Sequence, residues 1–412
     1  MTSHRDENYR SRAMVLEALL LLVLTQQGAH SDAPTQETSA ESTEDTQKEK
    51  EKKGFDAAVI PLPNFNSDLG AGLGVVGGAY IYKPGYSPYR FAFAAEIFHT
   101  TRGVSVDWIR FDAPDLFPRV RVELRFDFFK QPFAPYYGPG NLTVPGFASV
   151  PGGKERFFTY DRLTMGGWVR ARFSPFGKEH PLHAYVAYSY RWNRVRPFPD
   201  SLLEQQQPLG SQGGRAGGIL AGLYWDTRDV EGQPTKGGII DVSTQTFLVP
   251  LGSSFNYEQL TLSAKHYWTV APKLVLASRL AIDALLGDVP FYAWPTSGGV
   301  YFFGGVGGSS TVRGVTLNRY SGEYQVLLNG ELRWLPIEFR LLKVNTHVGL
   351  AGFLDLGRVW QPGVEDGSFF HFHVGTGGGL RLTRREAVIR VDYAEWLGAR
   401  HRALYITFGE AF

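Results

Sequence analysis

The sequence predicts an all-β protein, a transmembrane antiparallel β-barrel of sixteen strands. Three observations lead to this fold class. Aromatic side chains make up 14% of the 412 residues and glycine accounts for 48 of them, a composition that favours strands over helices. Apolar and charged side chains alternate along many segments, as in strands that lie between lipid and an aqueous lumen. Short and long connections also alternate along the chain, although a soluble β-sandwich would show alternating side chains as well.

The charge balance and the absence of cysteine exclude several classes of function. The formal net charge is +2, which argues against a nucleic-acid partner because such proteins carry a basic excess. The chain contains no cysteine, so disulfide bonds and cysteine metal sites are ruled out. We expect no metal and no cofactor.

The first 31 residues have the order of a secretory signal peptide. Three arginines precede the apolar run AMVLEALLLLVL, and small residues follow at Ala29 and Ser31. The run is too short to span a bilayer, which takes about 20 apolar residues. A buried helix of a cytosolic protein is the alternative. We expect residues 1–31 to be removed, and no cysteine follows that could carry a lipid anchor.

Residues 32–54 are predicted to form a disordered periplasmic linker, and residues 55–412 the barrel. The stretch DAPTQETSAESTEDTQKEKEKK is charged and nearly free of large apolar side chains. Such a segment cannot bury enough apolar surface to offset the entropy that it would lose on ordering.

The alternation is clearest in two segments of the predicted barrel. In PRVRVELRFDFF, every second residue from Val120 to Phe128 is apolar and the residues between them are charged. In EAVIRVDYAEW, Ile389 and Val391 lie opposite Arg390 and Asp392. Sixteen segments are predicted as strands: 56–64, 69–82, 89–100, 103–112, 119–130, 157–173, 182–195, 214–227, 238–248, 257–270, 273–286, 322–336, 344–360, 368–382, 386–396 and 403–412.

The connections between these segments indicate an outer-membrane orientation. Long connections follow the fifth, seventh and eleventh segments, whereas most connections after even segments are turns such as EGQPTKG and VAPK. Bacterial outer-membrane barrels combine short periplasmic turns with long extracellular loops. Closure of the sheet satisfies every backbone polar group in lipid, and an even strand count places both termini in the periplasm.

The chain ends in ALYITFGEAF, which resembles the C-terminal strand signal of bacterial outer-membrane proteins. Leu404, Ile406, Phe408 and Phe412 share one face of the predicted strand, while Glu410 interrupts it. The resemblance implies that Phe408 and Phe412 act as an assembly signal, and that deletion of Phe412 slows membrane assembly more than it destabilises the folded barrel.

Several motifs resemble the BamA/TamA superfamily of outer-membrane assembly barrels, also called bacterial surface antigens. TVRGV at 311–315 is similar to its VRG loop motif, with Val315 where an aromatic residue is usual, and FLDLG at 353–357 matches its F-x-D-x-G strand motif. GGGLRLTRREAVIRVDY resembles its penultimate hairpin. The matching residues are Asp226, Thr227, Arg228, Asp229, Pro234, Thr235, Lys236 and Gly237 in a strand–turn–strand signature, Arg313 and Gly314 in the loop, Glu331 in the next strand, and Phe353, Asp355 and Gly357 in the strand after it.

The resemblance implies a sixteen-stranded barrel whose long sixth extracellular loop folds back into the lumen. Residues 287–321 follow the eleventh predicted strand and would form this loop, with the glycines of GGVGGSS allowing the chain to reverse. Arg313 is then expected to meet Glu331 and Asp355, because its planar fork engages two carboxylates at once. Family members usually carry periplasmic POTRA domains, and residues 32–53 are too few to hold one.

Two functions remain open at this stage. The first is protein insertion or translocation, in which the seam between the first and last strands opens. Pro61 and Pro63 would weaken that seam if they lie on the side of the first strand that faces the last strand. Alternatively, they precede the strand. The second function is a passive pore or structural barrel without an assembly role. The expected partners are outer-membrane lipid and either a separate periplasmic protein or an unfolded outer-membrane protein.

The sequence does not predict an enzyme. It contains no G-x-S-x-G nucleophile motif. His371 and His373 lie on one face of a predicted strand with Glu365 and Asp366 nearby, and two such imidazoles can bind a metal. Polar residues at the edge of a loop are the simpler interpretation of this pair.

Overall fold

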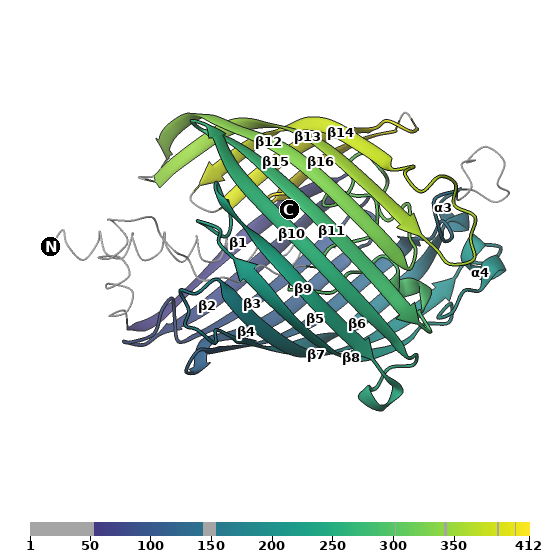
Figure 1. The fold of residues 1–412 in the computed structure, drawn as a ribbon, viewed down its shortest axis with the longest axis horizontal. Helices are drawn as coiled ribbons and strands as arrows, with labels where there is room; N and C mark the ends of the chain where they lie inside the picture. The colour runs from purple at the N-terminus through teal and green to yellow at the C-terminus, as the bar shows by residue number, and fades with distance from the viewer. Residues whose placement is uncertain (1–52, 143–153, 301, 342–343, 385–386, 400) are drawn as a thin grey trace.

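The computed structural model describes residues 53–142, 154–300, 302–341, 344–384, 387–399 and 401–412. The described residues form a closed antiparallel barrel of sixteen strands, in which each strand pairs with its neighbours in sequence and β16 meets β1 (Figure 1). None of the helices in these ranges is long and apolar enough to cross a membrane. The predicted signal peptide and nearly all of the predicted linker lie outside the described residues.

Each of the sixteen predicted segments contains one strand, and the bounds differ by a few residues. The strands are β1 (Gly54–Asn66), β2 (Gly70–Tyr82), β3 (Phe91–Thr100), β4 (Ser105–Phe117), β5 (Val120–Pro135), β6 (Thr159–Phe173), β7 (Leu182–Pro197), β8 (Gly214–Asp226), β9 (Gly237–Phe247), β10 (Tyr257–Ala271), β11 (Leu274–Gly287), β12 (Tyr324–Leu341), β13 (Val344–Trp360), β14 (His373–Arg384), β15 (Ala387–Trp396) and β16 (His401–Phe408). Short helices lie between them: α3 (Lys154–Phe157), α4 (Leu202–Gln206) and the 3-10 turns η1 (Val249–Leu251) and η2 (Phe291–Ala293).

Apolar side chains face outward along the strands and charged ones face the lumen. In β5, Phe126 is 45% exposed whereas Glu123 is 0% exposed. In β15, Tyr393 is exposed while Arg390 and Asp392 are buried. This arrangement suits a wall with lipid on one side, because the polar groups are satisfied inside the barrel. The alternation predicted from the sequence is confirmed.

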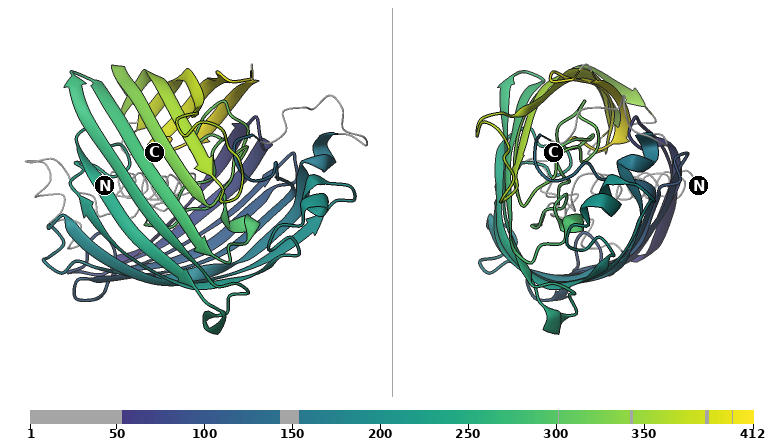
Figure 2. Two further views of the ribbon diagram at one scale, coloured as in Figure 1. Left: turned by 45° about the vertical axis from the view of Figure 1, so that its right-hand side comes forward. Right: turned by 90° about the vertical axis from the view of Figure 1, so that its right-hand side faces the viewer.

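The long connections after β5, β7 and β11 leave from one end of the barrel, where α3 and α4 lie (Figure 1). At this end, Tyr136, Leu203, Phe291 and Tyr292 pack in one buried cluster and join the three connections. We call the opposite end, where the β8–β9 and β10–β11 turns lie, the short-turn end. A view along the barrel shows the connection between β11 and β12 inside the ring of strands (Figure 2).

Candidate functional site

The connection between β11 and β12 packs inside the barrel as a compact hairpin. Val306 bridges to Tyr320, and the N–H of Gly308 donates to the carbonyl of Val315 at 2.9 Å. Val312 and Val315 are fully buried among side chains of the inner wall, which include Ala281, Leu327 and Val359. The glycine-rich segment is therefore held in one place by apolar packing, and its tip brings Arg313 to the centre of the lumen.

Arg313 lies between the two carboxylates with which the sequence pairs it. Its Nε and Nη2 donate to the two oxygens of Asp355 at 2.7 and 3.0 Å, and its backbone N–H donates to the same carboxylate at 3.1 Å. Its Nη1 donates to Glu331 Oε2 at 2.5 Å. Arg313 and Asp355 are both 0% exposed. Three donors on one carboxylate fix the position and orientation of the loop tip.

The other two residues of the F-x-D-x-G motif also contact the loop. The Arg313 guanidinium carbon lies 3.4 Å from the centre of the Phe353 ring, in cation–π contact. At Gly357, a Cβ atom would lie 2.6 Å from a methyl group of Val312. Phe353, Asp355 and Gly357 share the inner face of β13, so the motif forms a seat for the loop.

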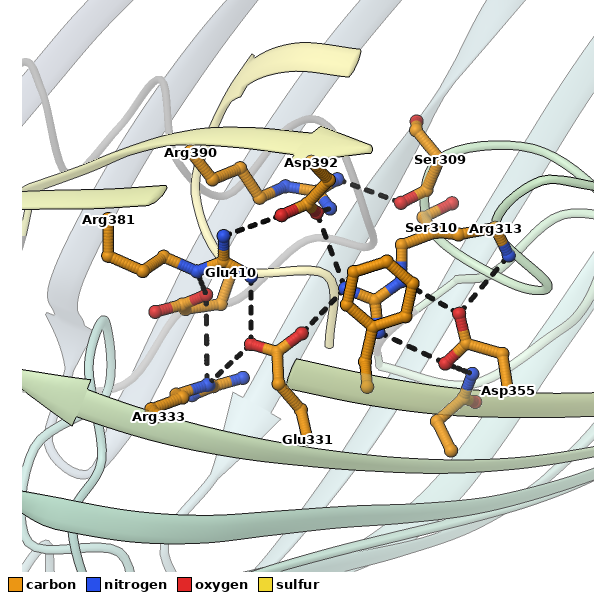
Figure 3. A network of polar contacts seen from close by, with 12 residues as sticks. Ser309, Ser310, Arg313, Glu331, Arg333, Asp355, Arg381, Arg390, Asp392 and Glu410 are labelled. Carbon is orange, nitrogen blue, oxygen red and sulfur yellow. Dashed lines mark hydrogen bonds and ion pairs between the residues drawn. The ribbon is translucent and has the colours of Figure 1, made fainter. Parts of the chain in front are cut away.

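The network around Arg313 is wider than the sequence indicates (Figure 3). Asp392 on β15 accepts from Arg313 Nη1 at 3.3 Å, from Arg381 at 2.5 Å and from Arg390 at 2.6 Å. Glu331 also accepts from Arg381 at 3.0 Å and from Arg333 at 2.9 Å. Desolvating so many charges offsets much of the attraction between them, so the network fixes geometry more than it adds stability.

Sequence reasoning missed Asp392, Arg381, Arg390 and Arg333 as members of this network. The inward parity of Arg390 and Asp392 was recognised, and parity alone could not show that loop residues would reach them. Arg390 and Arg279 also donate to the backbone carbonyls of Ser309 and Ser310, at 2.9 and 2.7 Å. Arginines on three strands thus hold the loop, through its backbone as well as through Arg313.

The strand–turn–strand signature closes the β8–β9 turn at the short-turn end. Arg228 binds the Asp226 carboxylate through Nε and Nη2, at 2.9 and 2.6 Å. Asp229 accepts from Thr235 N and Oγ1, at 2.9 and 2.5 Å, and from Lys236 N at 3.3 Å. The Thr227 hydroxyl pairs with the backbone of Gly238, which follows Pro234 and Gly237 in the turn. These residues make a turn, and the Arg313 network is separate from them.

The seam between the first and last strands is short. β1 pairs with β2 along its whole length, and β16 pairs with β15 at every position. Among the described residues, β1 and β16 pair at two positions, Phe65 with Ile406 and Asn66 with Tyr405. Ser67 adds hydrogen bonds to Leu404 at the same end. The edge of β1 from Gly54 to Asn64 has no partner in β16.

Pro61 and Pro63 explain where the pairing stops. Both lie within β1, opposite Val75 and Leu73 of β2, so the alternative that they precede the strand is wrong. Backbone N–H groups alternate between the two sides of a strand, and the N–H of Ser67 donates to β16 at 3.1 Å. Residues 61 and 63 have the same parity, so the donors that their rings remove belong to the seam side.

The register shows what these missing donors affect. Continuing from the pair Phe65–Ile406, Pro63 would lie opposite Phe408 and Pro61 opposite Glu410. The carbonyls of Phe408 and Glu410 would then find no donor on β1. A strand that gains half of its hydrogen bonds is poorly held, and β16 ends at Phe408.

The last four residues turn into the lumen, contrary to the predicted strand 403–412. Gly409 adopts the left-handed conformation (φ 79°) that allows the turn, and Glu410 binds Arg381 at 3.1 Å. Phe412 is buried against Tyr267 on the inner wall instead of facing lipid, and Phe408 packs against Ile60 and Leu62 of β1. Glu410 therefore interrupts the apolar face because it belongs to the lumen. The assembly-signal role of Phe408 and Phe412 stays a prediction.

The loop also contacts the seam directly. The N–H of Leu317 donates to Asp68 Oδ1 at 3.1 Å, in the turn after β1. His401 Nδ1 donates to the carbonyl of Gly314 at 2.7 Å, and the N–H of Gly314 donates to the Tyr405 hydroxyl at 3.4 Å. Burial raises the pKa of Asp68 to about 6, against the lowering effect of the Leu317 N–H and of His401. The loop thus joins β1 to β16 at the paired end of the seam.

His371 and His373 are part of the packing between loops. The His373 ring stacks on Tyr320 at 3.5 Å, and its Nε2 lies 3.1 Å from Asn141 Oδ1. Asp366 accepts from the backbone N–H of Asn141 at 2.5 Å. The described residues include no group of three metal-binding side chains. These contacts join three connections at the long-loop end.

Comparison with known proteins places this architecture in a family. Residues 109–412 match the Omp85 superfamily domain. BamA from Haemophilus ducreyi lacking POTRA domains 1–3 is similar in structure, with a TM-score of 0.59, 15% identity and coverage of 87% of this chain and 71% of that one. CdiB from Escherichia coli aligns with a TM-score of 0.59, 12% identity and coverage of 87% and 63%, and CdiB from Acinetobacter baumannii with 0.51, 12%, 86% and 65%.

This chain therefore spans less than two thirds of the CdiB chains, and at these identities the likeness concerns the fold. None of the curated protein sequences compared with it is a match. The family match covers most of the barrel and includes the lumenal loop and the wall that binds it. The chain belongs to the Omp85 superfamily.

Proposed function

We propose that this protein is an outer-membrane barrel that inserts or translocates other proteins through the seam between β1 and β16. The observation that carries the proposal is the unpaired edge of β1 from Gly54 to Asn64, beside a seam with two residue pairs. An unpaired strand edge is a template for a further strand, and in lipid it must find partners for its polar groups. A substrate strand at this edge supplies such partners.

The arrangement of the lumen favours this function over a passive pore. An open pore needs a free path along the barrel, whereas here the loop occupies the lumen and is fixed by Arg313 and its carboxylates. The same loop contacts both sides of the seam, through Asp68 and His401. Its position and the state of the seam are therefore linked by direct contacts.

The proposal includes an orientation in the cell. A signal peptide of residues 1–31 would direct export, and both termini would lie in the periplasm, with the long connections outside the cell. The free edge of β1 begins at Gly54, near the short-turn end, so the seam would be open toward the periplasm. Substrates would arrive there as unfolded outer-membrane proteins, alone or with a separate periplasmic protein.

A disulfide lock across the seam tests the proposal. The chain has no cysteine, so Phe65→Cys with Ile406→Cys creates a single possible bridge between paired residues of β1 and β16. We expect the oxidised variant to lose its ability to support outer-membrane protein assembly or secretion in cells that depend on it. Reduction should restore the activity. The measurement is the abundance of other outer-membrane and surface proteins by quantitative mass spectrometry.

The matched control uses the other neighbour of the same residue. Phe65→Cys with Ala71→Cys bridges β1 to β2, away from the seam. This variant should stay active in the oxidised form. If the seam lock and the control lock behave alike, the seam is not the route and a structural or pore function takes its place.

A further inference from the structure

The ring of Phe412 occupies a pocket built by the barrel wall. Tyr267 on β10 and Val275 and Ala277 on β11 surround the ring, and the guanidinium carbons of Arg279 and Arg333 lie 5.1 and 5.7 Å from its centre. The strands that carry these side chains pair continuously with one another. The pocket therefore belongs to the wall and does not depend on the tail for its shape.

The tail is held mainly by its end. It lies outside the strand ladder, and the N–H of Gly409 donates to the Val388 carbonyl at 2.9 Å. Beyond that residue, the contacts are the Glu410 carboxylate near Arg381 and Arg333, at 3.1 and 3.7 Å, and the ring of Phe412. The Tyr267 hydroxyl lies 3.5 Å from the carbonyl oxygen of Phe412. Recognition rests on a terminal aromatic residue and an acid two positions before it.

Arg333 supplies a second sign of a binding site. It is 3% exposed, and neither of its Nη atoms has a hydrogen-bond partner within the described residues. Its Nε is engaged by Glu331 at 2.9 Å, which orients the fork. Buried donors without acceptors are unfavourable, and a guanidinium fork suits a carboxylate. A fork next to a phenyl ring is an arrangement that fits the carboxylate and side chain of a C-terminal phenylalanine.

We propose that this pocket binds the C-terminal phenylalanine of another polypeptide, with the free carboxylate on Arg333, when the tail of this chain withdraws. The inference rests on the proposed function and names its substrate class, an unfolded outer-membrane protein that ends in phenylalanine. The tail links Phe408, which contacts Ile60 and Leu62 of β1, to Phe412 in the pocket. A substrate bound in the same way has its preceding residues at the free edge of β1.

The test uses the full-length chain with Phe412→Ala, which empties the pocket, and a fluorescent peptide of sequence ALYITFGEAF. Fluorescence anisotropy in detergent micelles should show binding to this variant. Amidation of the peptide carboxylate, or alanine in place of its last residue, should weaken binding by roughly tenfold or more, as loss of a charged hydrogen bond or a buried ring does. The unaltered barrel should bind the peptide more weakly, because its own tail competes.

A filled pocket provides the control for peptide that binds elsewhere. Ala277→Phe in the Phe412→Ala chain places a ring in the pocket and should remove binding, with folding checked by the heat-dependent mobility of the barrel on gels. Equal affinity for the free and amidated peptides, or for the emptied and filled pockets, overturns the inference. A failed peptide test with an active seam leaves the proposed function standing, whereas peptide binding with an inert seam lock removes the function and keeps the pocket.

Discussion

Replacing Arg313 with alanine is expected to be among the most destabilising single substitutions in the lumen. Arg313 is fully buried, and its removal leaves Asp355 and Glu331 with negative charges that have lost their shared partner. Breaking one partner of a buried ion pair costs about 3–5 kcal/mol. The result should be a lower midpoint of thermal unfolding and faster proteolysis of the connection between β11 and β12. Arg215→Ala, which alters an exposed arginine on β8, should change neither quantity.

A double-mutant cycle isolates the contact itself. Asp355→Ala alone strands the guanidinium of Arg313, and the combined variant removes both charges. Because the two side chains share one interaction, we expect the double variant to lose much less stability than the sum of the two single variants. Additive losses would mean that the loop is held by something other than this pair, and the lumenal position of its tip would have to be abandoned.

Replacing Pro61 and Pro63 together with valine is expected to close the seam. Valine restores the two missing N–H donors on the side of β1 that faces β16, so the carbonyls of Phe408 and Glu410 gain partners. The pairing should then extend along the register of Phe65 with Ile406, which brings Ile60 opposite Ala411. The tail leaves the lumen in this closed state, and transport through the seam should fall accordingly.

Engineered cysteines report this closure. Ile60→Cys and Ala411→Cys should form a disulfide in most molecules of the valine variant and in few of the parent, because Ala411 now packs by Tyr267 while Ile60 packs by Phe408. Pro114→Val, on β4 and away from the seam, serves as the control and should leave the cross-linking unchanged. If the two backgrounds cross-link equally, the prolines do not determine where β16 ends.

The strand pattern could be predicted because it is local. A barrel strand in lipid must alternate, so inward residues such as Arg390 and Asp392 are readable from their neighbours in sequence. The meeting of Arg313 with Glu331 and Asp355 was available from the family motifs. These calls depend on residue type and spacing, which the chain displays directly.

The end of β16 could not be predicted because it depends on closure of the barrel. Whether Pro61 and Pro63 weaken the seam is decided by which side of β1 meets β16, and that side is fixed by the pairing of residues far apart in sequence. One signal was present: Glu410 has no place on a lipid-facing surface, and such an acid indicates that the chain has left the wall. The lumenal position of Phe412 follows from that departure.

Cross-linking at the free edge of β1 tests the central claim most directly. A photoreactive residue in place of Val59, which is 65% exposed on β1, should capture other outer-membrane proteins in growing cells. The same residue in place of Val242, which is 55% exposed on β9 and distant from the seam, should capture none above background. A set of protein adducts at Val59 that is absent at Val242 is the result that we expect. The same adducts at both positions, or none at either, would contradict a seam that receives substrate strands.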